Sequence, residues 1–169
     1  LGGPVRAFVV VGGAMGNRLL QLLDAENVPL EVCRVAAETG YSLAVTDEET
    51  EAQFRFTLPG AAVCESDARK IMDQITGTLA TDAYVVLSGG MPDGLADTYP
   101  QEVQATVSRR NGRMVVDTSK AALLRLIEAP VAPLDVLRLD RSEIEKAVAH
   151  RMRSISDTLA YTEQLVQRG

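Results

Sequence analysis

Short apolar runs alternate along the chain with longer stretches of helical periodicity. The runs at 7–11 (AFVVV) and 83–87 have the length and composition of buried strands. The stretch at 66–79 places apolar side chains every third or fourth position, which is typical of an amphipathic helix. Repeated alternation of strand and helix predicts an α/β fold, with a doubly wound, mainly parallel sheet that carries helices on both faces.

Residues 42–47 and 53–58 follow a different pattern, in which apolar and polar side chains alternate. An acidic turn at 48–51 joins them, so the pattern predicts an antiparallel hairpin. One face of this hairpin is apolar, with Leu43, Val45, Phe54, Phe56 and Leu58, and the other face holds Arg55 with Gln53 and Thr57. An apolar face of this size favours burial against a partner, and we expect a homodimer through the hairpin.

The turns that follow the strands are the candidate ligand sites. In open α/β sheets, ligands bind beyond the carboxyl ends of the strands. The turns in this position are residues 12–16, 88–94, 117–119 and 140–143.

The first turn, within "VVVGGAMGNR", partly matches a dinucleotide-binding fingerprint. Gly13 and Gly16 occupy the second and third glycine positions, but Val11 stands where the first glycine is required. A strand-to-helix turn that needs small residues for close packing explains the same residues, and we favour it. A dinucleotide-dependent oxidoreductase would rest on these two glycines alone.

The turn at 88–94, "SGGMPDG", has three glycines and one proline directly after a buried strand. Such a turn can serve packing only, or it can present backbone N–H groups to an anion. It is not a P-loop, because Gly-Lys-Ser/Thr is missing at its end. The residues alone leave both interpretations open.

Three other candidates also have structural explanations. Asp117 or Thr118 is expected to cap the helix that follows, and Asp140 with Glu143 forms the pattern of a capping box. Arg55 is either a solvated strand charge or a guanidinium placed for a phosphate or carboxylate.

Composition excludes several classes of protein. A net charge of −6 argues against general nucleic-acid binding, which needs clustered basic residues. No stretch is long and apolar enough to form a membrane-spanning helix. The two cysteines, Cys33 and Cys64, are expected to be buried thiols of a cytoplasmic protein, with one disulfide as the alternative. A single histidine and two cysteines do not make a zinc site.

Five segments, taken in order, resemble the PfkB (ribokinase-like) family of carbohydrate kinases. They are "LGGPVRAFVVVGGAMGNRLLQLLDAENVPLEVCRVAAET", "EAQFRFTLPG", "SGGMPDGL", "MVVDTSKAALL" and "VLRLDRSEIE". The second is similar to a lid strand of the 1-phosphofructokinase and tagatose-6-phosphate kinase branch. The resemblance implies a ribokinase-like domain over residues 1–169, with residues 40–59 as a β lid.

The resemblance also implies an activity, which is transfer of a phosphoryl group from ATP, with Mg²⁺, to a hydroxyl of a sugar phosphate of the fructose 1-phosphate or tagatose 6-phosphate type. Arg55 matches the lid arginine that binds the substrate's phosphate. Gly13, Ser88 and Gly89 match the sugar side of the site. On the nucleotide side lie Arg138, Asp140 and Glu143, and Glu143 is linked indirectly to Mg²⁺.

The chain departs from the family pattern at several positions. The Gly-Ala-Gly-Asp motif that supplies the catalytic base is absent from the sequence, so we expect no catalytic residue and no activity in this chain alone. Gly40 replaces a phosphate-binding arginine, Gly90 replaces a serine, and Asp140 replaces an asparagine. The chain is therefore either part of a longer kinase or a non-catalytic sugar-phosphate or nucleotide-binding module on the same fold.

Overall fold

The computed structural model describes residues 5–149 and 151–168, and these form two compact units. The first unit holds the described residues up to Ile75 together with Pro92–Leu95, and the second holds Thr76–Met91 and the residues from Ala96 onward. The elements are β1 (Ala7–Val11), α1 (Gly13–Ala25), β2 (Leu30–Arg34), β3 (Tyr41–Thr46), β4 (Gln53–Leu58), α2 (Glu65–Thr78), β5 (Tyr84–Ser88), α3 (Tyr99–Ser108), β6 (Arg113–Asp117), α4 (Lys120–Glu128), β7 (Val136–Leu137), α5 (Arg141–Val148) and α6 (Ile155–Arg168).

The first unit is built on a parallel pair of strands. β1 pairs with β2 in a register that runs from Ala7 opposite Leu30 to Val11 opposite Arg34, and α1 connects the two strands. Val11 and Cys33 are fully buried here, and burial raises the pKa of the Cys33 thiol. Because both strands are parallel, the segments that follow Val11 and Arg34 leave the sheet at the same edge.

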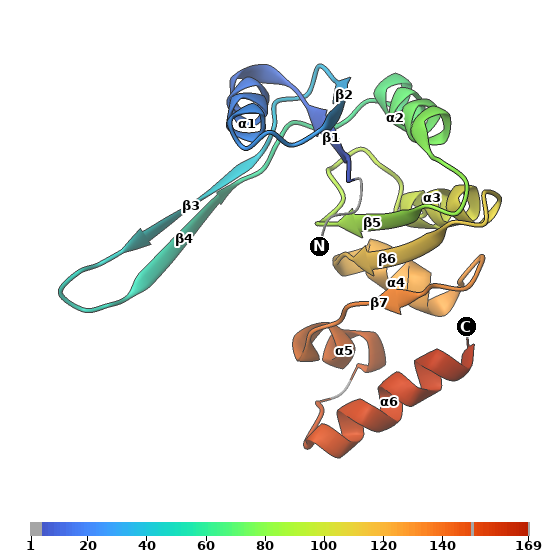
Figure 1. The fold of residues 1–169 in the computed structure, drawn as a ribbon. Helices are drawn as coiled ribbons and strands as arrows, with labels where there is room; N and C mark the ends of the chain where they lie inside the picture. Colours follow the sequence, from blue (N-terminus) through green and yellow to red (C-terminus); the bar gives the residue numbers. More distant parts are fainter. Residues whose placement is uncertain (1–4, 150, 169) are drawn as a thin grey trace. The chain divides into compact units, whose positions relative to one another are not determined.

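The predicted hairpin is present and projects from this body as β3 and β4 (Figure 1). Leu43 lies opposite Phe56 and Val45 lies opposite Phe54, so these side chains share one face. Every residue of both strands is exposed, including Phe54 and Phe56 at 54% and 55%. The hairpin therefore presents an uncovered apolar face.

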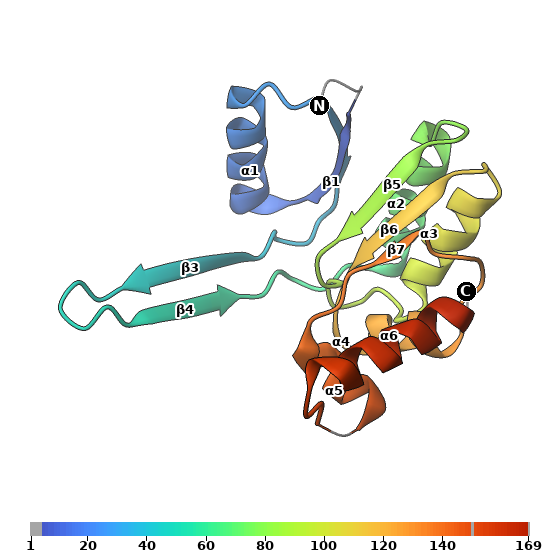
Figure 2. The ribbon, with the colours of Figure 1, turned by 60° about the horizontal axis from the view of Figure 1, so that its bottom comes forward.

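The second unit contains a parallel sheet of three strands in the order β5-β6-β7, which Figure 2 shows side by side. Its core forms where α3 packs against α4 and β6. Most of its buried apolar side chains come from these elements and from α5, and they include Val103, Val107, Met114, Val116, Leu123, Leu126 and Ile144. Pro100 lies in the first turn of α3, where its missing N–H disturbs no helical hydrogen bond.

The α/β architecture with a small antiparallel hairpin agrees with the prediction, and two details differ from it. The spacing of the leucines at 19, 20, 22 and 23 predicts a helix from about Asn17 to Ala25, whereas α1 begins at Gly13, so the first glycine turn is mostly helical. The expectation of two buried thiols is wrong for Cys64, which is exposed, and the two cysteines are not bonded to each other. Among the described helices, none has the length and apolar character to span a membrane.

Candidate functional site

The carboxyl ends of β5 and β6 hold two turns against each other. Ser88 and Asp117 end their strands in register, and the Gly89 N–H donates to the Asp117 carbonyl at 2.8 Å. The buried Thr118 hydroxyl donates in return to the Gly89 carbonyl at 3.0 Å. The backbone after Ser88 is therefore fixed in place by the neighbouring strand.

The glycines of the turn at 88–94 serve two different purposes. Gly89 has φ +102°, a backbone conformation that residues other than glycine rarely adopt. Within the described part of the chain, no atom lies within 4 Å of the position that a Cβ on Gly89 would take. A Cβ on Gly90 would meet only the Ser119 hydroxyl, at 3.6 Å. A Cβ on Gly94, in contrast, would overlap the Val63 carbonyl. Packing explains Gly94, whereas Gly89 and Gly90 form an open stretch of backbone.

Asp117 and Thr118 do not cap α4, contrary to the expectation from sequence. The N-cap is Ser119, and its side chain makes no capping hydrogen bond. Thr118 is turned to Gly89, and the Asp117 carboxylate lies 3.4 Å from the Arg138 guanidinium. Tertiary contacts across the strand ends have replaced the local contact that the sequence suggested.

Arg138 follows β7 and lies between two carboxylates. Its guanidinium is 3.4 Å from Asp117 and 3.9 Å from Glu143, while more than half of the side chain stays exposed. This position leaves the guanidinium free to turn toward a phosphate, which two of its N–H groups could bind together. Arg138, Asp117 and Glu143 thus form one charged group at the carboxyl end of the sheet.

The capping box at the start of α5 is confirmed. The Asp140 carboxylate accepts from the Glu143 N–H at 2.9 Å, and the Glu143 carboxylate accepts from the Asp140 N–H at 2.7 Å. The Glu143 N–H, with a smaller contribution from the Ser142 hydroxyl, holds the pKa of Asp140 below its ordinary value. Both carboxylates therefore have a structural role, whatever else they bind.

A direct metal site does not fit these residues. The Glu143 carboxylate already accepts from backbone and lies beside Arg138, and the described residues contain no group of three acidic, His or Cys side chains that could hold an ion. Mg²⁺ in kinases is commonly held by one or two carboxylates together with substrate phosphates. Within the described residues, the Glu143 carboxylate is already engaged, so an indirect contact with Mg²⁺ fits it better than direct coordination.

The glycine turn at the start of α1 is shaped by packing and by Glu38. A Cβ on Gly12 would overlap the Ala37 carbonyl, and one on Gly16 would lie within 3.0 Å of Val11 and Thr39. These contacts support the packing interpretation of the turn. Gly13, with φ +64°, has the Glu38 carboxylate in the place of a Cβ.

Glu38 is the residue that sequence reasoning missed in this unit. Its two carboxylate oxygens accept from the Ala14 and Met15 N–H groups at 3.2 and 2.9 Å. The available signal was its place shortly after β2, at the edge of the sheet where the turn after β1 also lies.

Arg55 lies on the exposed polar face of the hairpin, opposite Ala44. The same unit contains Gly13, whereas Ser88, Gly89, Arg138, Asp140 and Glu143 belong to the second unit. At Gly40, next to the hairpin, a Cβ would come within 2.6 Å of the Gly60 nitrogen. The backbone here leaves no space for any side chain.

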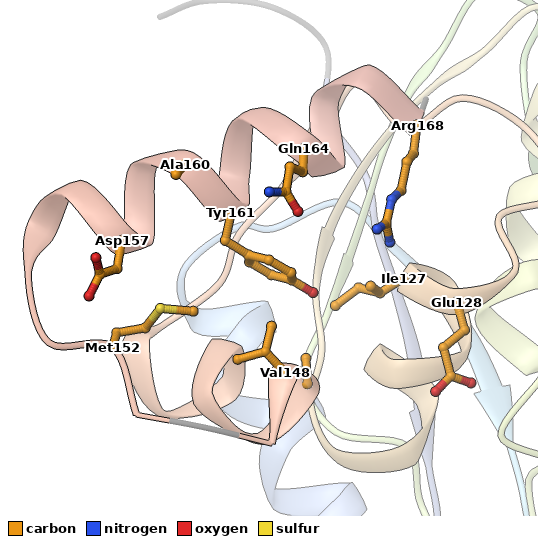
Figure 3. A pocket seen from close by; sticks show the side chains of 10 residues that line it. Ile127, Glu128, Val148, Met152, Asp157, Ala160, Tyr161, Gln164 and Arg168 are labelled. Carbon is orange, nitrogen blue, oxygen red and sulfur yellow. The ribbon is translucent and has the colours of Figure 1, made fainter.

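A separate groove of about 500 Å³ lies between α4, α5 and α6 (Figure 3). Tyr161 points from α6 toward Val148 and Ile127, and Arg168 and Glu128 lie at one end. None of the residues predicted for the site lines this groove. Its described walls mix apolar side chains with Glu128, Asp157, Gln164 and Arg168.

Comparison with known proteins gives a consistent result. The model of the pfkB family carbohydrate kinases matches residues 1–169. The chain is 31% identical over 169 residues to an ATP-dependent 6-phosphofructokinase isozyme 2 of Mycobacterium tuberculosis, and this match covers 100% of the chain and 49% of the relative. It is 29% identical to a 1-phosphofructokinase of Xanthomonas campestris, covering 99% of the chain and 53% of that relative.

Solved structures resemble the chain to the same extent. Phosphofructokinase-2 from Escherichia coli in complex with fructose-6-phosphate superposes with a TM-score of 0.89 at 27% identity, covering 100% of the chain and 55% of that protein. A possible 1-phosphofructokinase from Thermotoga maritima, 23% identical, shares the fold with a TM-score of 0.82 and covers 97% of the chain and 52% of that protein. The chain spans about half the length of the curated relatives it matches.

Proposed function

Because the chain belongs to the pfkB family of carbohydrate kinases, we propose that it carries the sugar-binding part of a kinase that phosphorylates a fructose phosphate with ATP. The observation that carries the proposal is the open Ser88–Gly89 backbone, held by Asp117 and Thr118 at the carboxyl end of β5 and β6. This is the edge of a parallel sheet where ligands bind. Such a turn can offer the Ser88 hydroxyl to a sugar, while the Gly89 N–H stays bonded to Asp117 and holds the turn in place.

The relatives narrow the choice of sugar. Two kinds of enzyme are similar to this chain, 6-phosphofructokinases and 1-phosphofructokinases, and one similar structure holds fructose-6-phosphate. We therefore put fructose 6-phosphate first, followed by fructose 1-phosphate and tagatose 6-phosphate. In each case Arg55 is proposed to bind the phosphate already on the sugar, since a guanidinium matches phosphate geometry. Gly13 is proposed to lie on the sugar side.

The nucleotide side is proposed to lie at Arg138, Asp140 and Glu143. Arg138 is placed to meet an ATP phosphate, which would draw its guanidinium from Asp117. Mg²⁺, carried in with ATP, would neutralise phosphate charge, and Glu143 would act on it indirectly. Asp140 keeps the start of α5 fixed beside Arg138. We also propose that the protein is located in the cytoplasm, where ATP is available.

A substrate panel tests the proposed function. The whole protein that carries this chain is assayed with ATP and Mg²⁺ against the three sugar phosphates, with unphosphorylated fructose as the control. We expect turnover with at least one sugar phosphate and a much higher KM for fructose, because Arg55 has no phosphate to bind. If fructose is turned over as fast as the sugar phosphates, Arg55 does not bind the substrate's phosphate, and the proposed substrate class is wrong.

A non-catalytic binding module is the second candidate, and one observation favours it. Gly40 stands where the family has a phosphate-binding arginine, and the backbone of Gly60 leaves no room for a side chain there. This candidate predicts that the whole protein binds a sugar phosphate or nucleotide and transfers nothing.

We also propose that the hairpin forms a homodimer. Its apolar face carries Leu43, Val45, Phe54 and Phe56, all exposed, over the length of two strands. Exposed contiguous apolar patches of this kind mark interaction sites. A second copy supplies an identical apolar face, so a symmetric contact would bury both.

A further inference from the structure

Glu38 joins two parts of the first unit that are far apart in the sequence. Its carboxylate accepts from the Ala14 and Met15 N–H groups in the first turn of α1. Its backbone carbonyl accepts from the Ala61 N–H at 3.1 Å, just beyond β4. We call these three hydrogen bonds the Glu38 bridge. The bridge connects the glycine turn after β1 to the base of the hairpin.

The surroundings hold Glu38 in this place. The neighbouring Thr39 exchanges two hydrogen bonds with Gly12, one through its hydroxyl at 3.0 Å and one through its N–H at 3.1 Å. A Cβ on Gly13 would overlap the Glu38 carboxylate, and one on Gly60 would press on the Glu38 carbonyl. Both glycines are therefore required for the bridge to form. The Thr39 contacts and the two glycines together favour this position of the exposed Glu38 side chain.

The bridge also determines the charge of the glycine turn. Unpaired N–H groups at the start of a helix attract anions, and a carboxylate there is stabilising. Glu38 supplies that carboxylate from within the chain and uses two of these N–H groups. A second anion, such as the phosphate of a substrate, would meet a negative charge where it would otherwise find two donors.

We propose that Glu38 is a positioning and specificity-determining residue, which rests on the proposed function. It fixes the turn that carries Gly13 to the base of the hairpin that carries Arg55. It also keeps anionic groups out of that turn, so that the turn receives the neutral hydroxyl part of the sugar and the phosphate is left to Arg55. Glu38 touches no reacting atom in this role.

The first test measures the bridge itself by amide hydrogen exchange in the whole protein that carries this chain. In Glu38→Ala we expect exchange at Ala14 and Met15 to quicken by about tenfold, because their acceptor is removed, whereas Ala61 should change less because its acceptor, the backbone carbonyl of residue 38, remains. Glu38→Gln keeps one acceptor and should recover part of the protection. Glu48→Ala, an exposed acid in the hairpin turn, is the matched control and should change none of the three amides.

Two results in this first test would contradict the bridge. One is unchanged exchange at Ala14 and Met15 in Glu38→Ala. The other is faster exchange throughout β1 and β2 in the variant, which would indicate general destabilisation in place of a local role.

The second test measures specificity in the whole protein. Glu38→Ala should raise KM for the sugar phosphate about tenfold with kcat within about twofold, the size expected when one charge-assisted contact is lost. Inorganic phosphate should become a stronger inhibitor of the variant than of the wild type and should shift the Ala14 and Met15 amide resonances in the variant only.

The outcomes separate the two proposals. An unchanged KM together with equal phosphate shifts in variant and wild type would overturn the role of Glu38 while leaving the kinase assignment intact. A wild-type protein that turns over no sugar phosphate would instead overturn the proposed function. In that case the exchange and phosphate-shift data would still decide whether Glu38 excludes anions from the turn.

Discussion

At Gly13 and Gly77 the same substitution to alanine meets opposite surroundings. Gly13 has φ +64° and faces the Glu38 carboxylate, whereas Gly77 lies in α2 with nothing within 4 Å of an added Cβ among the described residues. Gly13→Ala should lower the free energy of unfolding by at least about 1 kcal/mol, from backbone strain and displacement of Glu38. Gly77→Ala should raise it by about 0.5 kcal/mol. Urea unfolding of both variants checks this, and equal effects would contradict it.

The capping box at Asp140 makes stability depend on pH. The Glu143 N–H holds the pKa of Asp140 below its ordinary value, so ionised Asp140 stabilises the folded chain above the unfolded pKa of about 3.9. That contribution is lost as pH falls through the lower folded pKa. Asp140→Ala should therefore lower the urea midpoint at pH 7 and have a smaller effect near pH 3.

Asp73→Ala, at an exposed position in α2, serves as the control for this variant. It should change the midpoint little at either pH. If Asp140→Ala lowers the urea midpoint as much at pH 3 as at pH 7, the charge of the carboxylate is not involved.

Arg55 is the residue that we propose to bind the phosphate already on the sugar. Replacing it with alanine in the whole protein should raise KM for the sugar phosphate by about ten- to a hundredfold, the range for a lost hydrogen bond to a charged group. The KM of Arg55→Lys should lie between those of the wild type and Arg55→Ala, since an ammonium keeps the charge and loses the paired donors. Steady-state kinetics measures these values. An unchanged KM in Arg55→Ala would show that Arg55 is only a solvated surface charge.

Individual residues were predictable where their partners are close in the sequence. The capping box of Asp140 and Glu143 spans three residues, so its pattern is visible without the fold. Thr118 and Glu38 find partners 29 and 24 residues away, at Gly89 and Ala14. Their contacts exist because parallel strands bring distant turns to one edge of the sheet. The local sequence pattern does not predict such contacts.

Among the elements, the hairpin was the easiest to predict and α1 the hardest to bound. Alternation with period two fixes which side chains share a face, and the observed register agrees with it from Tyr41 opposite Leu58 to Thr46 opposite Gln53. The start of α1 at Gly13 depends on N–H groups that Glu38 satisfies from outside the helix. The glycines in that turn favour a later start of the helix, because glycine has a low helix propensity.

The hairpin is also the element at which dimerisation can be tested. Phe56→Lys places a charge in the middle of the apolar face and should convert a dimer into a monomer in sedimentation at micromolar concentration. Thr57→Lys adds the same charge to the opposite face and should leave the dimer intact. Equal effects of the two variants, or a monomeric wild type, would contradict a dimer through the apolar face.

At the scale of the whole molecule, strand–helix alternation predicted the α/β class but not the arrangement of strands. The described strands form three separate sheets, β1-β2, β3-β4 and β5-β6-β7. Pairing between strands depends on contacts that span tens of residues, and composition does not encode it. Membership of the pfkB family follows from a match over residues 1–169, and the chain covers about half of each relative.

Phosphorus NMR of one reaction mixture tests the central claim most directly. The whole protein that carries this chain is incubated with ATP, Mg²⁺ and fructose 6-phosphate, with fructose 1-phosphate and tagatose 6-phosphate in parallel. We predict that a second phosphate resonance appears on at least one sugar at the rate at which ATP becomes ADP. Binding of sugar phosphate with no new sugar resonance would contradict the kinase and leave the non-catalytic module.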